Sequence, residues 1–405
     1  MKIPELLAPA GSWESLSAAV KAGADSVYFG IKELNMRETA KNFNLDDLEK
    51  ITGFCRKNKV KAYLTLNTII YENEIDSVKK ILVAAKNAKI DAVICWDFAV
   101  IEECNNLKIP FHISTQASVS NSESAKFFKN LGAQRIVLAR ECSLAQIKEI
   151  KKRANIEIET FIHGAMCVSI SGRCFTSQFL YNRSANRGDC IQPCRRSYIV
   201  KDLEENKTLK LDNNYVMSAK DLCMIKSIDK LIEAGIDAFK IEGRTKSADY
   251  VKIVVEKYRQ ALDSYKQAKL TKELKDKLHQ ELKNVYHRGF SQGFYFGKPI
   301  NEFAEQYGGI QKQVKVYAGI VVNFYKEISV AEIKLEGSDI KKGDKITVIG
   351  PTTGCVIQVV QSMEKDPGKK IKKAKKGTNI GIKMENLVRE NDKVYVIKVN
   401  KAVVH

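Results

Sequence analysis

The chain has 405 residues, of which 44% are hydrophobic, so it can bury a substantial core and is long enough for more than one domain. Its ten cysteines are too sparse for a disulfide scaffold, which excludes the small disulfide-rich class and favours reduced thiols. A net charge of +19 predicts attraction to a polyanion such as RNA, although a solvated lysine-rich surface also explains this charge.

The N-terminal residues 1–7 turn polar before a long apolar stretch develops. No uninterrupted apolar run in the sequence is long enough to span a bilayer. We therefore expect a soluble, cytoplasmic protein with no signal peptide and no membrane partner.

Short apolar runs alternate with amphipathic stretches in the first part of the chain, as in parallel α/β proteins. The runs that predict strands are 5–8, 26–30, 61–67, 92–96, 111–115, 135–139, 157–162 and 238–242. The stretches that predict helices include 13–22, 45–57, 74–88, 122–131, 144–153 and 219–234. Eight such units indicate a (β/α)8 TIM-like barrel over residues 1–265, and an open doubly wound sheet is the competing architecture.

The interval 164–217 contains no clean strand-helix unit, so it is interpreted as an insertion after the seventh strand. A helical stretch at 248–268 follows the eighth strand, and residues 266–310 are interpreted as a helical or linking segment.

Residues 311–405 change to the period-two alternation that predicts strands, which indicates a small C-terminal all-β barrel. This segment carries +9 of the net charge. Its loop 368–377 is a candidate for phosphate contact, and a plain solvated hairpin is the alternative. The candidate phosphate-binding residues are Lys369, Lys370, Lys372 and Lys373.

Four cysteines occur on two short stretches of the insertion, at Cys167 and Cys174, then at Cys190 and Cys194. Four thiolates suit either an iron-sulfur cluster or structural zinc. The spacings differ from the two short Cys-x-x-Cys knuckles of zinc ribbons, so a cluster is the preferred interpretation. The other six cysteines are scattered in helix or strand patterns and are interpreted as apolar core residues.

Polar residues also stand where predicted strands end, which in a barrel of this type is the side that carries the chemistry. Glu242 and Arg244 close the eighth strand, and Asn67 and Gln116 occupy comparable positions from which an amide could read a base edge. His163 is a candidate for proton transfer near neutral pH, with a hydrogen-bonded structural histidine as the alternative.

The pattern Glu159-x-Phe161-x-x-Gly164-Ala165-Met166-Cys167-x4-Gly172-x-Cys174 resembles the signature of peptidase family U32, the collagenase-like proteins. One departure is Thr176, where the signature usually has an aliphatic residue. Agreement extends along most of the chain, through LAPAGS at 7–12, AGADSVYFG at 22–30, STQ at 114–116 and KIEGR at 240–244. The resemblance is closest to the prephenate-dependent tRNA uridine hydroxylases, whose appended C-terminal barrel the last domain also resembles.

This resemblance implies a [4Fe-4S] cluster held by the four insertion cysteines. It implies hydroxylation of a wobble uridine of tRNA at C5, with prephenate as co-substrate. Prephenate has two carboxylates, which guanidinium groups bind bidentately, so an arginine-rich barrel mouth is expected. The candidate arginines are Arg37, Arg187, Arg195 and Arg196, besides Arg244.

Other functions compete with this reading. Related family members hydroxylate ribosomal RNA or a ubiquinone precursor, and a lipid-like substrate would leave the basic last domain unexplained. A peptidase is the next alternative, but the sequence contains neither a His-Glu-x-x-His zinc motif nor a Gly-x-Ser-x-Gly nucleophile elbow. A Cys167–His163 nucleophile pair would exclude Cys167 from a metal. A pure RNA-binding role explains the charge but not the cysteines, and a paralogous U32 chain is a possible partner.

Overall fold

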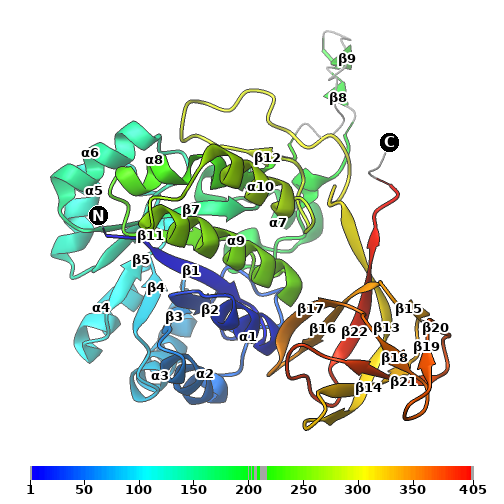
Figure 1. Cartoon of the computed structure of the whole chain (residues 1–405). Helices are drawn as coiled ribbons and strands as arrows, with labels where there is room; N and C mark the ends of the chain where they lie inside the picture. The colour runs from blue at the N-terminus through cyan, green and yellow to red at the C-terminus, as the bar shows by residue number, and fades with distance from the viewer. Residues whose placement is uncertain (1, 199, 202, 205–207, 210–216, 403–405) are drawn as a thin grey trace.

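The computed structural model describes residues 2–198, 200–201, 203–204, 208–209 and 217–402. Eight parallel strands form a closed barrel, because β11 pairs with both β1 and β7 (Figure 1). The barrel strands are β1 (Glu5–Ala10), β2 (Ser26–Phe29), β3 (Lys61–Thr65), β4 (Ala92–Cys95), β5 (Phe111–Ile113), β6 (Arg135–Val137), β7 (Glu157–Gly164) and β11 (Ala238–Ile241). The predicted TIM-like barrel is confirmed, and closure excludes the open sheet.

Helices surround the barrel and bury one apolar face each against the strands. They are α1 (Trp13–Lys21), α2 (Leu48–Lys57), α3 (Ile75–Asn87), α4 (Phe98–Leu107), α5 (Ser122–Asn130), α6 (Leu144–Ala154), α8 (Ile228–Glu233) and α9 (Ala248–Lys266). Local signals start them: the Ser12 side chain accepts from the amide of Ser15 to begin α1, and Asp97 caps α4. None of the helices in the described part of the chain is both long and apolar enough to cross a membrane.

The helix predicted over 219–234 is wrong in its first half. β10 (Asp221–Cys223) runs antiparallel to the end of β7, with Leu222 opposite Gly164, and α8 begins only at Ile228. The apolar run 222–225 is buried throughout, and a short buried run has no periodicity that separates a strand from a helix. β10 also pairs with β12 (Phe290–Ser291), which follows α10 (Lys272–Leu282).

The cysteine-bearing segment 164–217 lies between β7 and β10, and is described at 164–198, 200–201, 203–204, 208–209 and 217. Its elements are short: α7 (Thr176–Tyr181), β8 (Val200–Lys201), β9 (Thr208–Leu209) and three 3-10 turns, η4 (Ile170–Gly172), η5 (Ala185–Arg187) and η6 (Pro193–Arg195). It rests on loops after several barrel strands. Its Gly188 carbonyl accepts from the amide of Glu38, and the Arg173 guanidinium donates to Ser118 Oγ.

The C-terminal part is an eight-stranded antiparallel sheet with a hydrophobic core of its own. Its strands are β13 (Gln313–Tyr325), β14 (Val330–Leu335), β16 (Lys345–Gly350), β17 (Gly354–Val359), β18 (Met363–Glu364), β19 (Lys370–Ile371), β21 (Asn379–Lys383) and β22 (Lys393–Val399), with β15 (Ile340–Lys341) and β20 (Lys373–Ala374) as a separate pair. The alternating burial of β14 and β22 explains the period of two in the sequence. The predicted all-β C-terminal architecture is confirmed.

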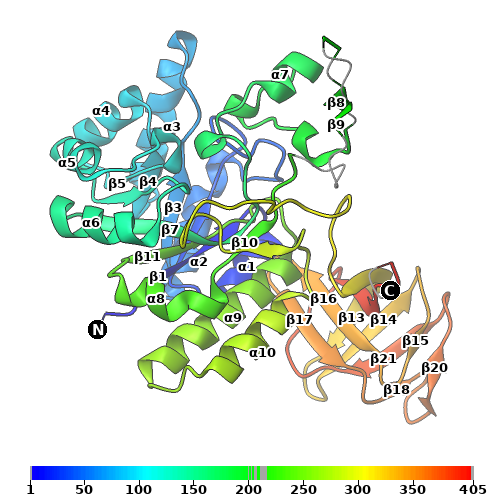
Figure 2. The ribbon, with the colours of Figure 1, turned by 90° about the horizontal axis from the view of Figure 1, so that it is seen from above.

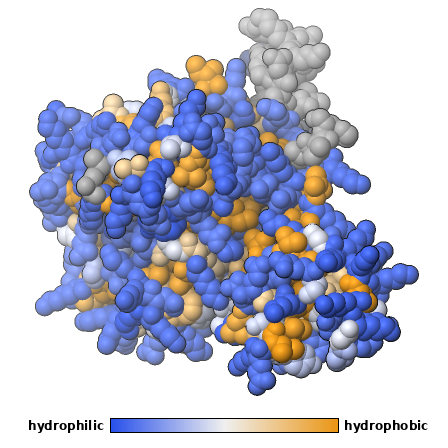
Figure 3. All heavy atoms as spheres, viewed as in Figure 1, coloured by the Kyte–Doolittle hydropathy of each residue, from blue (hydrophilic) through white to orange (hydrophobic). Residues whose placement is uncertain are grey.

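This sheet packs on the barrel beside α1 and α9 (Figure 2). Ser17 Oγ donates to the carbonyl of Pro351, and Ala18, Ala248 and Cys355 form a small apolar cluster between the two parts. Figure 3 shows a largely hydrophilic face on which apolar side chains gather near this junction.

Candidate functional site

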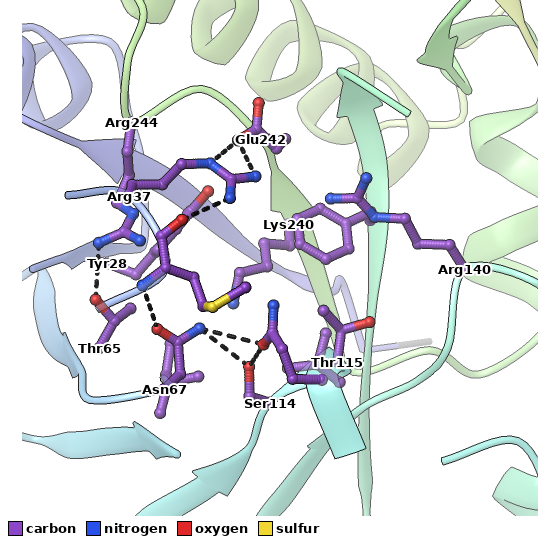
Figure 4. A pocket seen from close by; sticks show the side chains of 15 residues that line it. Tyr28, Arg37, Thr65, Asn67, Ser114, Thr115, Arg140, Lys240, Glu242 and Arg244 are labelled. Carbon is purple, nitrogen blue, oxygen red and sulfur yellow. Dashed lines mark hydrogen bonds and ion pairs between the residues drawn. The ribbon is translucent and has the colours of Figure 1, made fainter. Parts of the chain in front are cut away.

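A cavity of about 50 Å³ opens at the carboxyl ends of the barrel strands (Figure 4). Side chains from β2, β3 and β11 and from the loops after β5 and β6 line it. Five of the predicted site residues lie together here: Arg37, Asn67, Gln116, Glu242 and Arg244. The barrel topology brings them together because the carboxyl ends of parallel strands meet on one face.

Three neutral polar side chains form one side of the cavity. Asn67 Nδ2 donates to Ser114 Oγ and to Gln116 Oε1, each at 3.2 Å, and Ser114 in turn donates to Gln116. The backbone amide of Met36 donates to Asn67 Oδ1 at 3.2 Å, which fixes the orientation of that amide. All three side chains are buried, so the cluster presents a rigid set of donors and acceptors.

Glu242 follows β11 directly and pairs with Arg37, whose Nε and Nη2 lie 3.2 and 3.1 Å from Glu242 Oε1. Burial raises the pKa of Glu242, but the charges of Arg37, Arg140 and Lys246 outweigh it and hold that pKa below its ordinary value. Glu242 is therefore ionised at neutral pH.

Arg140 and Arg244 face the cavity with neutral partners. Arg244 Nη1 donates to Asn35 Oδ1 at 3.0 Å and to Thr65 Oγ1 at 2.8 Å, and Arg140 Nη1 donates to the carbonyl of Ala165 at 2.7 Å. Within the described residues no carboxylate is in ion-pair distance of either guanidinium, and Arg140 Nε is buried without a hydrogen-bond partner.

This buried environment lowers the pKa values of both arginines. Burial, and then the charge of Arg37, lowers the pKa of Arg244 to about 10. Burial also lowers the pKa of Arg140. Figure 4 shows the two guanidinium groups on opposite sides of the cavity. The site thus presents buried positive charge that an anionic ligand would stabilise.

Below the cavity, the barrel interior contains ion pairs that we call the floor network, beside an apolar cluster that includes Leu7 and Tyr63. Arg135 lies 3.0 Å from Glu5, 2.8 Å from Glu157 and 3.3 Å from Glu159, and Lys240 Nζ lies 2.7 Å from Glu159. Burial lowers the pKa of Arg135, but its hydrogen bond and the charges of its carboxylates raise it above its ordinary value. This network supports Lys240, which also lines the cavity.

His163 does not line the cavity. The ring is buried among Tyr250, Tyr258 and Phe290, with its Nδ1 3.4 Å from the Tyr258 hydroxyl. Burial lowers the pKa of His163 to about 3, so the imidazole is neutral at physiological pH. The structure thus places His163 apart from the other predicted catalytic residues.

The three insertion arginines predicted to bind substrate are engaged around the mouth, outside the cavity lining. Arg187 pairs with Glu74, and Arg195 donates to the carbonyls of Met166 and Ala219. Arg196 is exposed, with its guanidinium 5.6 Å from the ring centre of Tyr181.

The predicted phosphate-binding lysines lie on the C-terminal sheet, at β19, β20 and the turns beside them, and are exposed. These are Lys369, Lys370, Lys372 and Lys373. Lys373 pairs with Asp339 at 3.0 Å. They form a surface separate from the cavity.

The four insertion cysteines gather beside the cavity mouth. Three of the four sulfur atoms accept a hydrogen bond from the backbone amide two residues later, each at 3.4 Å. The donors are the amides of Ser169 for Cys167, Thr176 for Cys174 and Gln192 for Cys190. Arg140 of the cavity donates to the carbonyl of Ala165, two residues before Cys167, so the cysteine-bearing segment adjoins the cavity. Hydrogen bonds of this kind stabilise thiolates and tune iron-sulfur clusters.

The thiols also affect one another. Burial raises the pKa of Cys194, and the charges of Cys167, Cys190 and Cys174 raise it further. Burial likewise raises the pKa of Cys190. Within the described residues no group of three or more His, Cys, Asp or Glu side chains has the arrangement that holds a metal ion. The donor set is nevertheless four mutually interacting cysteines with amide hydrogen bonds, which fits a thiolate-ligated metal centre.

Sequence reasoning missed Arg140, Lys240 and Ser114 as cavity residues. Arg140 follows the sixth strand and Ser114 the fifth, so the strand-end rule that selected Asn67 could have found both. Lys240 lies inside a buried strand, where a charged residue is itself a signal, because burying a charge without a partner is costly.

A model of peptidase family U32 matches residues 11–305, well over half of the chain. The chain belongs to peptidase family U32. Three U32 relatives align over nearly its full length. "Uncharacterized protease MJ0090" of Methanocaldococcus jannaschii is 45% identical, over 98% of this chain and 99% of its own. A "Collagenase" of Porphyromonas gingivalis is 41% identical, over 96% and 97%. "tRNA hydroxylation protein P1" of Bacillus subtilis is 36% identical, over 92% and 90%. The names of these relatives divide between proteolysis and RNA hydroxylation.

Proposed function

We propose that this U32 protein is an iron-sulfur-dependent tRNA hydroxylase that acts on a uridine at C5, with prephenate as co-substrate. The Bacillus subtilis relative, named for tRNA hydroxylation, supports an RNA substrate. The net charge of +19 and the exposed lysines of β19 and β20 support attraction to its phosphates.

The observation that carries the proposal is that neither Arg140 nor Arg244 has a carboxylate within ion-pair distance in the part of the chain that the structure describes. A buried charge without a counterion is costly, so Arg140 and Arg244 favour a ligand that brings its own negative charge. A dicarboxylate supplies one carboxylate to each side of the cavity, and guanidinium forks bind such groups bidentately. Prephenate has this chemistry, whereas a neutral peptide segment does not.

The amide cluster suits a pyrimidine base. Uracil offers both donors and acceptors on its edge, and Asn67 and Gln116 carry both kinds of group. Glu242 remains ionised and orients Arg37 toward the cavity. A flipped base would lie between these groups and the co-substrate.

Cys167, Cys174, Cys190 and Cys194 would hold a [4Fe-4S] cluster, which supplies electron transfer when bound. Arg140 of the cavity donates to the carbonyl of Ala165, two residues before Cys167, so these cysteines belong to the segment that contacts the cavity lining.

The cavity is small for these ligands. It measures about 50 Å³, whereas ligand pockets typically have roughly 300–1,000 Å³. The segment 164–198 covers the mouth through contacts such as Arg187 with Glu74 and Arg173 with Ser118. We therefore expect this segment to shift when substrate enters.

Proteolysis receives support from the names of two relatives and none from the site geometry. A thiol protease needs an imidazole beside its nucleophile. His163, the histidine closest in sequence to Cys167, is buried against Tyr258 outside the cavity lining.

The test is mass spectrometry of tRNA nucleosides from cells that lack the gene, restored with wild type, Cys190→Ala or Cys55→Ala. Cys55 is a buried cysteine of α2 and serves as the matched control. We expect 5-hydroxyuridine or its derivatives to return with wild type and Cys55→Ala and to stay absent with Cys190→Ala. An unchanged nucleoside profile on gene loss would overturn the proposal.

A further inference from the structure

The segment 164–198 differs in composition from the rest of the chain. It holds five of the fourteen arginines and none of the 53 lysines, with Asp189 as its one acidic residue. Elsewhere in the chain lysine outnumbers arginine by 53 to nine, whereas every basic residue of this segment is arginine. Arginine differs from lysine in that its planar group stacks on rings and binds phosphate bidentately.

Three of these arginines lie over aromatic rings. Arg173 is 6.0 Å from the ring centre of Trp96, and Arg187 is 4.9 Å from that of Tyr71. Arg196 is 5.6 Å from the ring centre of Tyr181. Trp96 and Tyr71 follow β4 and β3, so this arrangement extends from the insertion onto the barrel mouth.

Further aromatic rings on this face are exposed. Phe179 is 84% exposed and Phe175 is 62% exposed, and their ring centres lie 5.9 Å apart. Leaving such rings in water is unfavourable, so they indicate a contact surface. Figure 2 shows α7, which carries Phe179, well apart from the C-terminal sheet.

We propose that Phe175, Phe179 and Tyr181, with Arg173 and Arg196, form a stacking surface for unpaired bases of an RNA loop. This inference rests on the proposed function and names the form of its substrate, single-stranded rather than duplex RNA. Bases stack on aromatic rings and on guanidinium planes, while the same arginines contact the phosphates. The surface adjoins the mouth, so it would hold the bases beside the one that enters the cavity.

A protein partner is the other class of occupant for exposed aromatic side chains. The composition favours RNA, because the segment 164–198 has a net charge of +4 and Asp189 already pairs with Arg183. A protein partner would need an acidic surface to match these arginines, whereas RNA carries a charge at every nucleotide.

The experiment measures binding of a short fluorescent oligouridine to the purified full-length protein by anisotropy, without turnover. The variants are Phe179→Ala and, as the matched control, Phe127→Ala, an exposed phenylalanine on α5. We expect Phe179→Ala to weaken binding about tenfold, the size of one lost base stack, and Phe127→Ala to leave it unchanged. An abasic oligomer of equal length should bind wild type more weakly than oligouridine binds Phe179→Ala, because it loses every stack and not only one.

Three results would overturn the inference. Equal affinity of Phe179→Ala and wild type removes the stacking role. Equal binding of abasic and uridine oligomers leaves only phosphate contact. A change in sedimentation on Phe179→Ala, with RNA affinity intact, assigns the surface to a protein interface. Because turnover is not measured, a protein that stacks RNA but makes no 5-hydroxyuridine refutes the proposed function alone.

Discussion

At the floor of the barrel Arg135 reaches three carboxylates, whereas at the mouth Arg140 and Arg244 are held by neutral acceptors. Burial penalises the charge at all three sites. Carboxylates reverse that penalty at the floor, where the pKa of Arg135 is raised, and not at the mouth, where both values are lowered. The same residue type is therefore ion-paired at the floor, whereas at the mouth it is left for the anionic ligand that we propose.

Removing Arg135 should produce the largest loss of stability. Arg135→Met takes a buried counterion from Glu5 and Glu159, which keep only Lys61 and Lys240, so we expect the free energy of unfolding to fall by about 3 kcal/mol. Urea unfolding measures it. Arg153→Met is the control, because Arg153 pairs with Glu149 on the exposed surface of α6 and should change stability by less than about 0.5 kcal/mol. Similar losses at the two sites would contradict a structural role for the floor network.

Replacing an arginine by methionine at the mouth should lower activity more than stability. Arg244→Met removes a cavity guanidinium that we propose binds the anionic co-substrate, together with its hydrogen bonds to Asn35 and Thr65. We therefore expect kcat/KM to fall about 100-fold with a stability loss of about 1 kcal/mol. Single-turnover assays and urea unfolding of one preparation separate these effects. A stability loss as large as that of Arg135→Met, with activity intact in the folded fraction, would reverse the contrast between mouth and floor.

His163 should affect acid stability. Its folded pKa of about 3 lies below the ordinary value of 6.5, so the unfolded chain binds the proton first. The stabilisation from its neutral form is complete above about pH 6.5 and is lost as the pH falls toward 3. His163→Phe should therefore flatten the decline of the urea midpoint between pH 6.5 and 4. Tyr258→Phe keeps the imidazole and should keep the slope, and equal slopes in His163→Phe and wild type would refute the account.

The smallest effect should come from the exposed lysines of β19 and the turn after it. Lys370→Ala with Lys372→Ala should weaken tRNA binding a few-fold and reduce the slope of log affinity against log salt by about one to two. Filter binding at several salt concentrations tests this. Lys79→Ala with Lys80→Ala, on α3, is the control pair. Equal slopes for both pairs would mean that these lysines are only part of a solvated surface.

The sequence pattern was sufficient for both parts of the chain. Short apolar runs between amphipathic stretches predicted the barrel strands, which are buried along most of their length, and alternation of apolar and polar residues predicted the C-terminal strands. The pattern failed over 219–234, where a tertiary pairing with β7 makes a strand of residues that carry no distinguishing period. Asn67 and Gln116 were predicted as site residues because each follows a parallel strand. Arg140 also follows a parallel strand, so the same reasoning could have predicted it.

The order of the strands, the family and the set of four cysteines follow from the sequence, since each rests on local patterns of residue types. Which charges meet depends on how the barrel closes. Closure of the barrel brings Glu159 to Arg135, whereas Arg140 and Arg244 form no ion pair with any described residue. It also turns His163 away from the cavity. Whether a buried charge has a counterion depends on the spatial distance between side chains that are far apart in sequence. No local sequence pattern encodes this spatial distance.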